Sequence, residues 1–185
     1  MLIFATLQIA SGQTWVAKVA SSSTVLGDAL AANPRDPHIL YGVPGGHRLY
    51  ISRDRGYTWN PYGNPVPQVG SADNVIKSIA VSPRDTLQIV VGVESANSNP
   101  DRVMKTTDGG MSWIQTWSGS FAYYGKPVEF KAAHPDTMYT MGSDTLWRST
   151  DFGSSWVIVR TTTGLFGAWC DAELRPDSAN VMFLG

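Results

Sequence analysis

An eight-residue pattern that recurs along the chain decides its fold. It first reads SRDRGYTW over Ser52–Trp59, and it returns as TTDGGMSW over Thr106–Trp113 and as STDFGSSW over Ser149–Trp156. Each copy has a hydroxyl residue, any residue, Asp, any residue, Gly, two further residues and Trp. The aspartates of successive copies are 54 and 43 residues apart. We call these three segments the aspartate hairpins, because an Asp followed by Gly in this setting is typical of a tight turn between two strands.

A second element precedes each hairpin and sets the repeating unit. It is an apolar strand that ends in Pro, a short polar turn, and an apolar run that ends in Gly. Its copies are Ala29–Gly42, Ser78–Gly92, Phe130–Gly142 and Ala172–Gly185. The unit therefore reads strand, Pro turn, strand, loop, strand, aspartate hairpin, strand. Units of four short strands at this period are typical of a β-propeller blade.

The expected fold is therefore all-β, a β-propeller of four-stranded antiparallel blades in a single domain over residues 1–185. About 3.5–4 blades are expected, near 25–60, 75–118 and 127–160 with a partial blade at 169–185. We expect a piece of a larger propeller. The alternative is a closed four-bladed ring, in which residues 1–19 supply the outer strands of the last blade.

The composition agrees with a turn-rich β protein. The 185 residues include 18 Gly, 11 Pro and 7 Trp, and 16% are charged, against about 25% in a typical globular protein. The net charge of −1 argues against nucleic acid as a partner, since nucleic-acid binders usually carry a basic excess. The single Cys170 and three scattered histidines have no zinc-ligand spacing, so neither a metal nor a cofactor is predicted.

The three hairpins resemble the Asp box, or bacterial neuraminidase repeat, and the resemblance extends over nearly the whole chain. The family includes sialidases, sortilin-type receptor ectodomains, xyloglucan-cleaving glycoside hydrolases and a photosystem assembly factor. It implies a propeller fold, while the activities of its members differ widely.

We expect the hairpin residues to be structural. The Asp should accept bonds from backbone N–H groups two residues on, the Gly should supply a positive φ, the hydroxyl should bond the same loop, and the Trp should bury its ring between blades. The residues concerned are Ser52, Asp54, Gly56 and Trp59, then Thr106, Asp108, Gly110 and Trp113, then Ser149, Asp151, Gly153 and Trp156.

Strand alternation predicts which face could meet a ligand. If the innermost strand of each blade enters at the top, the Pro turns and aspartate hairpins lie at the bottom, and other loops build the top. The expected top loops are 60–74, 94–102, 118–127 and 161–169. The ligand-binding candidates there are Lys77, Tyr123, Tyr124, Phe166 and Trp169, with Tyr62 and Phe121 as further aromatic side chains. The alternative is that the aromatic rings pack over blade edges.

Three acids near the starts of inner strands, Asp28, Glu129 and Asp171, are weak catalytic candidates. A carboxyl pair would serve glycoside hydrolysis at about 5–5.5 Å for retention or about 6.5–9.5 Å for inversion. The alternative is a solvated rim, where Lys77 pairs with a neighbouring acid. The sequence has no Arg-Ile-Pro stretch like that of sialidases, and xyloglucan-cleaving relatives use two Asp residues on separate propeller domains, so neither activity gains support.

The N-terminal stretch MLIFATLQIA, residues 1–10, is too short to span a membrane. It is either the remnant of a signal peptide or the first of two strands, Ile3–Gln8 and Thr14–Val19. Residues 8–15 resemble a degenerate copy of the hairpin, which keeps Gly12, Thr14 and Trp15 but has Ala10 in place of the Asp.

These observations predict a secreted or surface propeller module that binds a glycan or a protein and has no catalysis of its own. The alternatives are a fragment of a glycoside hydrolase and an assembly factor for a membrane-bound partner.

Overall fold

The computed structural model describes residues 29–69, 74–95, 99–121, 128–130, 134–142, 144–161, 172–174 and 182–184. The expectations for the strands before residue 29, for the completion of the last blade and for closure of the ring lie outside the described residues.

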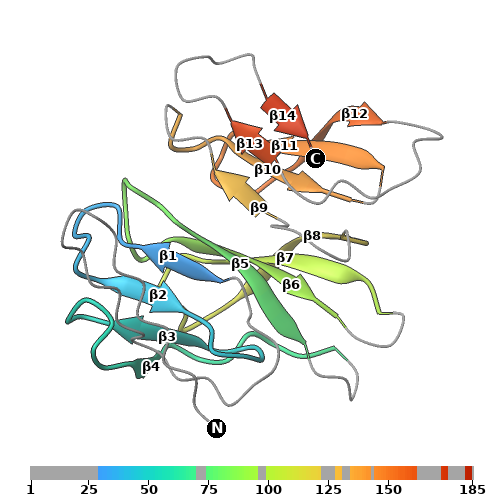
Figure 1. The fold of residues 1–185 in the computed structure, drawn as a ribbon. Coiled ribbons are helices and arrows are strands. Elements are labelled where there is room, and N and C mark those ends of the chain that lie inside the picture. The colour runs from blue at the N-terminus through green and yellow to red at the C-terminus, as the bar shows by residue number, and fades with distance from the viewer. Residues whose placement is uncertain are drawn as a thin grey trace, which may run out of the picture.

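The described chain is built from antiparallel sheets (Figure 1). Three of them have four strands in chain order, and we call them blades 1, 2 and 3. Blade 1 holds β1 (Leu30–Ala32), β2 (Leu40–Gly42), β3 (Leu49–Ser52) and β4 (Asn60–Tyr62). Blade 2 holds β5 (Val75–Val81), β6 (Ile89–Glu94), β7 (Asp101–Thr106) and β8 (Ile114–Gly119). Blade 3 holds β9 (Val128–Phe130), β10 (Met138–Met141), β11 (Thr145–Ser149) and β12 (Val157–Thr161), and β13 (Ala172–Leu174) pairs with β14 (Met182–Leu184).

The first strands of the blades lie together at the centre. β5 contacts both β1 and β9, and Figure 1 shows β5 in the middle of the three blades. The later strands of each blade lead outward from this centre. The blades therefore stand side by side around their inner strands, as in a sector of a propeller.

The hydrophobic core lies between blades. Since side chains alternate along a strand, Val91 and Met104 of blade 2 face blade 1, whereas Val90 and Val103 face blade 3. One buried cluster joins the first pair to Tyr41, Leu49 and Ile51 of blade 1. The other joins the second pair to Val128, Met138 and Phe152 of blade 3. Blade 2 is covered on both faces, and all six residues of β7 are accordingly buried.

The Pro turns also tie neighbouring blades together. The residue after the proline is Arg35 in blade 1 and Arg84 in blade 2. Arg35 donates from Nε to the carbonyl of Pro83 at 3.0 Å, and the Arg84 guanidinium lies 2.9 Å from a carboxylate oxygen of Asp136. Each arginine thus reaches the Pro turn of the next blade.

The all-β fold with four-stranded antiparallel blades was predicted correctly, but the boundaries of the expected top loops were wrong. The expected loop from residue 60 begins only after Tyr62, because Asn60–Tyr62 forms β4 beside β3. The expected loop over 94–102 is shorter, since β6 runs to Glu94 and β7 begins at Asp101. The expected loops 118–127 and 161–169 likewise begin inside strands, since β8 runs to Gly119 and β12 runs to Thr161.

Candidate functional site

The aspartate hairpins have one hydrogen-bond pattern in all three blades. In blade 2, the Thr106 hydroxyl donates to Asp108 at 2.7 Å and accepts the N–H of Gly110 at 2.8 Å. The Asp108 carboxylate also accepts from the backbone N–H and the hydroxyl of Ser112, at 2.9 and 2.5 Å. Blades 1 and 3 repeat these four bonds around Asp54 and Asp151.

The backbone of each hairpin has two consecutive residues with positive φ. These are Arg55 and Gly56 at 62° and 86°, Gly109 and Gly110 at 71° and 84°, and Phe152 and Gly153 at 51° and 76°. A type I′ turn requires this pattern. The first residue of each pair also donates its N–H to a carbonyl in the Pro turn of its own blade, at 2.8–3.0 Å. Hairpins and Pro turns therefore share one edge of the molecule, the bottom, as expected.

The sequence analysis missed one hydroxyl residue in each hairpin and misplaced the backbone donor. The main backbone donor to the carboxylate is four residues on, at Thr58, Ser112 and Ser155, not two. The side chains of the same residues donate to the second carboxylate oxygen. The signal was present, since each copy has Ser or Thr directly before its Trp.

These bonds favour the ionised carboxylate. Hydrogen bonds from Thr58 and Ser52 lower the pKa of Asp54 to about 2, and those from Ser112 and Thr106 lower the pKa of Asp108 to about 2. At Asp151, partial burial raises the pKa, but hydrogen bonds from Ser155 and Ser149 outweigh it and the net shift is downward. The hairpin aspartates are thus fixed acceptors rather than proton donors at neutral pH.

Two of the three hairpin tryptophans join neighbouring blades. The indole N–H of Trp113 donates to the Asn64 carbonyl that follows blade 1, at 3.1 Å. The indole N–H of Trp156 donates to the Thr116 hydroxyl on β8, at 3.2 Å. Trp59 instead donates within its own hairpin, to the Gly56 carbonyl at 3.2 Å.

At the opposite edge, the top, blade 2 has a charged cluster. The Lys77 ammonium lies 2.9 Å from a carboxylate oxygen of Glu94, and both side chains are partly exposed. Lys77 stands at a bulge in β5, since Ile76 pairs with Val93 and Ser78 pairs with Gly92. This is the pairing of Lys77 with a neighbouring acid that the sequence analysis considered.

Asp101 binds the described ends of two top loops of blade 2, at Ser95 and at Phe121. One carboxylate oxygen accepts the N–H of Ser95 at 2.8 Å, and the other accepts the N–H of Phe121 at 2.6 Å. Burial raises the pKa of Asp101, the two N–H bonds lower it, and the charge of Glu94 adds to the upward shift. Asp101 was not among the predicted site residues, because it fell within the expected loop 94–102.

The structure places only some of the sequence-predicted site residues. Lys77 is described as above, whereas only the backbone of Glu129 is described, on β9. Asp28, Asp171, Tyr123, Tyr124, Phe166 and Trp169 lie outside the described residues.

Two aromatic residues expected on the top loops are used for packing. Phe121 stacks on Trp117, with ring centroids 5.1 Å apart and an interplanar angle of 11°. Tyr62 lies on β4 and meets Tyr41 edge-on at 5.5 Å. Its hydroxyl reaches the turn at Gly109, where an added Cβ would lie only 2.8 Å away. The expectation of a top-loop position for Tyr62 was therefore wrong, because this ring fills the bottom of the interface between blades 1 and 2.

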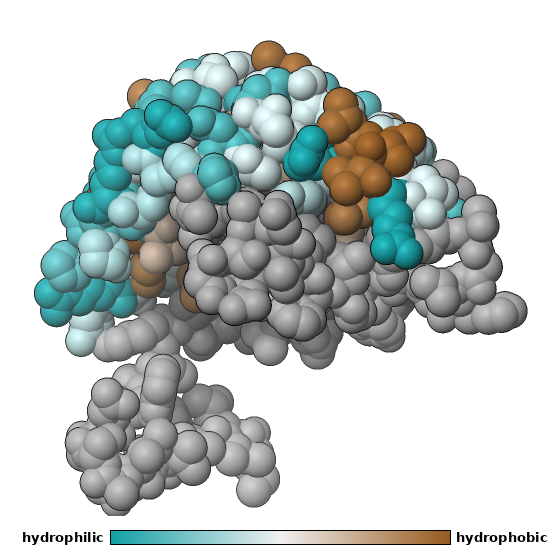
Figure 2. Space-filling view, turned by 90° about the horizontal axis from the view of Figure 1, so that it is seen from above, coloured by the Kyte–Doolittle hydropathy of each residue, from teal (hydrophilic) through white to brown (hydrophobic). Residues whose placement is uncertain are grey.

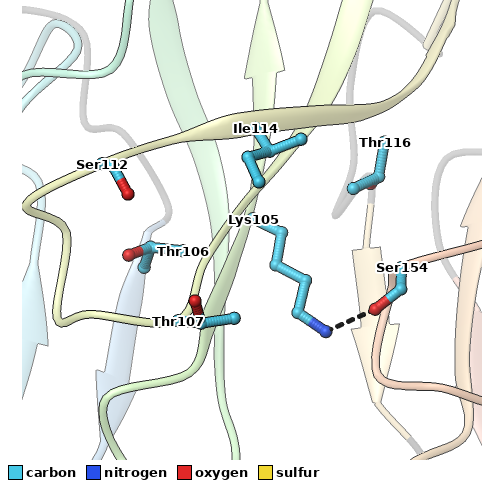
Figure 3. A pocket seen from close by; sticks show the side chains of 7 residues that line it. All are labelled: Lys105, Thr106, Thr107, Ser112, Ile114, Thr116 and Ser154. Atoms are coloured by element: carbon cyan, nitrogen blue, oxygen red, sulfur yellow. Dashed lines mark hydrogen bonds between the residues drawn. The ribbon is translucent and has the colours of Figure 1, made fainter.

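A cavity of about 190 Å³ lies between the hairpins of blades 2 and 3. Figure 3 shows the Lys105 side chain running along it from β7 toward Ser154, with Ile114 and Thr116 of β8 on one side. The cavity is lined by Lys105, Thr106, Thr107, Ser112, Ile114, Thr116 and Ser154.

Among the described residues, no group of three or more His, Cys, Asp or Glu side chains is placed to hold a metal ion. The same part of the chain includes no helix that is long and apolar enough to cross a membrane.

No protein-family model matches the sequence, and no curated protein matches it. Several solved structures, however, are similar to the chain in fold. An auxiliary nutrient binding protein from Bacteroides thetaiotaomicron matches with a TM-score of 0.59 at 14% identity, over 86% of this chain and 35% of that one. The GH74 xyloglucanase from Xanthomonas campestris matches with a TM-score of 0.54 at 20% identity, over 85% and 22%. YCF48 bound to D1 peptide matches with a TM-score of 0.52 at 22% identity, over 76% and 41%.

The chain therefore spans less than half the length of each of these proteins. At such identities the likeness concerns the fold alone. Together with the radial four-stranded sheets, it shows that the described chain has the architecture of a β-propeller sector.

Proposed function

We propose that this chain is a propeller binding module whose partner, a glycan or a protein segment, meets the top face, and that it has no catalysis of its own. The observation that carries the proposal is that the two acids described at the top of blade 2 are both engaged with other groups of the protein. Glu94 is paired with Lys77, and both oxygens of Asp101 accept backbone N–H groups. Neither is free to act as the general acid or the nucleophile of a glycosidase.

The fold neighbours are compatible with this proposal. One is an auxiliary nutrient binding protein, and another is bound to a peptide. The Lys77–Glu94 pair offers a donor and an acceptor to either kind of partner. We further propose that the hairpins are Asp boxes, on the strength of their three identical sets of bonds.

A fragment of a glycoside hydrolase is the second candidate, favoured by the likeness to a xyloglucanase. The two are separated by assaying one preparation with a glycan array, a peptide array and a panel of chromogenic glycosides. We expect binding without turnover. We also expect Lys77→Met and Glu94→Gln to weaken binding, while Arg84→Met, an exposed change at the bottom, leaves it unaltered. Turnover that disappears in Glu94→Gln would establish the hydrolase instead.

We also propose that the protein is secreted or displayed at the cell surface, with the apolar residues 1–10 as part of an export signal. Fusion of residues 1–28 to an alkaline phosphatase that lacks its own signal tests this in bacteria. Phosphatase activity is expected, and an inactive but abundant fusion would favour the alternative of two strands.

A further inference from the structure

The cavity between the hairpins of blades 2 and 3 exists because blade 2 differs from blade 1 at equivalent repeat positions. Counted from the hairpin, Thr116 corresponds to Tyr62 and Ser154 corresponds to Met111. The Tyr62 ring reaches the turn at Gly109 and fills the first interface. The smaller Thr116 lines the cavity at the corresponding position, while Phe152 is buried in the core between blades 2 and 3. The cavity is thus a property of the second interface.

The charge pattern of the cavity restricts what it can hold. Lys105 is 8% exposed, and its ammonium donates to the Ser154 hydroxyl at 2.7 Å and the Asp151 carbonyl at 3.3 Å, both neutral groups. The ammonium also lies over the Phe152 ring, 5.6 Å from the ring centroid. The ionised carboxylate of Asp108 binds the lining residues Thr106 and Ser112, and Asp151 lies near Lys105. These two negative charges oppose a ligand anion, so the site favours a neutral ligand.

The walls of the cavity match one chemical class. Thr107, Ser112 and Lys105 contribute to its lining, and Ile114, 65% exposed, offers an apolar surface. A sugar ring presents hydroxyls at its rim and C–H groups on its face. The volume of about 190 Å³ lies below the roughly 300–1,000 Å³ of pockets for drug-sized ligands.

We infer that this cavity is a binding site for a single neutral sugar ring, at the bottom edge and separate from the proposed top-face site. The Lys105 ammonium donates to a ring hydroxyl, Thr107 and Ser112 contact further hydroxyls, and Ile114 packs against the C–H face. The inference goes beyond the proposed function because it needs neither the top face nor its partner.

The test is a titration of the ¹⁵N-labelled chain with methyl glucoside, galactoside, mannoside and xyloside, followed by amide chemical shifts. We expect at least one sugar to shift the amides of Lys105, Ile114, Thr116 and Ser154 in a saturable manner. The double variant Thr107→Arg, Ser154→Met copies the residues of the first interface, Arg53 and Met111, onto two exposed positions. It should keep the fold and lose the shifts. Met111→Ser, on an equally exposed position of the other hairpin, is the matched control and should retain them.

Three results would overturn the inference. They are the absence of saturable shifts for all four sugars, shifts that persist in the double variant, and shifts of the same amides by sulfate or phosphate but by no sugar. Should the double variant fail to fold, Ser154→Met alone serves the same purpose. Shifts at Lys77 and Glu94 report on the top face in the same spectra, so failure of one site is distinguishable from failure of the other.

Discussion

Each hairpin depends on one buried hydroxyl, and Thr106 shows why. Thr106 is 2% exposed, and its hydroxyl donates to Asp108 and accepts the N–H of Gly110, a residue with positive φ. Without the hydroxyl, both the N–H and one carboxylate oxygen lose a partner inside the turn. A buried donor left without an acceptor is costly, whereas the methyl groups of Val match the shape of Thr.

We therefore predict that Thr106→Val destabilises the chain by about 1–3 kcal/mol. The measurement is chemical denaturation at neutral pH. Thr107→Val, at the exposed next position, is the control and should change the free energy of unfolding little. Equal effects of the two variants would mean that the hydrogen bonds of the Thr106 hydroxyl contribute nothing to the stability of the chain.

The hairpin aspartates make stability depend on pH. The pKa of Asp54 and of Asp108 is about 2 in the folded chain, against about 3.9 when unfolded. The unfolded chain binds protons first, so stability is complete above about pH 5 and falls as the pH drops toward 2. The raised pKa of the buried Asp101 acts in the opposite sense.

Denaturation midpoints should accordingly decrease between pH 5 and pH 2.5. The decrease should be smaller in Asp108→Asn, since that side chain no longer titrates. An unchanged slope in this variant would contradict the assignment of a low pKa to Asp108.

At the scale of the element, each interface between blades combines a large side chain from one blade with a small residue from the other. Between blades 1 and 2, the large Tyr62 meets the small Gly109. Between blades 2 and 3, the large Phe152 stands at the repeat position of Gly109, and the small Thr116 stands at that of Tyr62. Gly109 has a φ of 71°, and a Cβ there would lie 2.8 Å from the Tyr62 hydroxyl.

Gly109→Ala should therefore destabilise the chain by about 2–4 kcal/mol, through the left-handed backbone and the clash together. In a Tyr62→Phe background the same change should cost about 1 kcal/mol less, because the hydroxyl that meets the Cβ is gone. Thermal or chemical denaturation of the four proteins of this cycle gives the coupling. If the two changes in the free energy of unfolding are strictly additive, the contact between the Tyr62 hydroxyl and the new Cβ contributes nothing to the destabilisation.

Repeat spacing and turn chemistry were enough to predict the blades, since each turn type is determined by local residues such as Asp-x-Gly. The interfaces could not be predicted in the same way. Whether Tyr62 faces a ligand or the next blade depends on what stands opposite it, here Gly109, which lies 47 residues away. Asp101 was missed for a similar reason, because its partners Ser95 and Phe121 belong to two different loops.

At the scale of the whole molecule, the two edges of the blades have different roles in this account. The bottom edge is held by repeated hydrogen bonds, and the top edge has the Lys77–Glu94 pair and the hydrogen bonds from Ser95 and Phe121 to Asp101. In the view of Figure 2, the coloured surface is largely hydrophilic and has a compact apolar patch. The outermost strand β12 is exposed along its length and contributes Val157, Ile158 and Val159 to the apolar surface.

The central claim is binding at the top face without catalysis, and proton NMR of one sample tests it most directly. The folded chain is mixed with xyloglucan oligosaccharides and with a peptide pool, and spectra are followed over days. The account predicts saturation transfer from protein to at least one of these ligands, with no new reducing-end anomeric signals. New anomeric signals that grow with the wild-type chain, and fail to grow with Glu94→Gln, would contradict it.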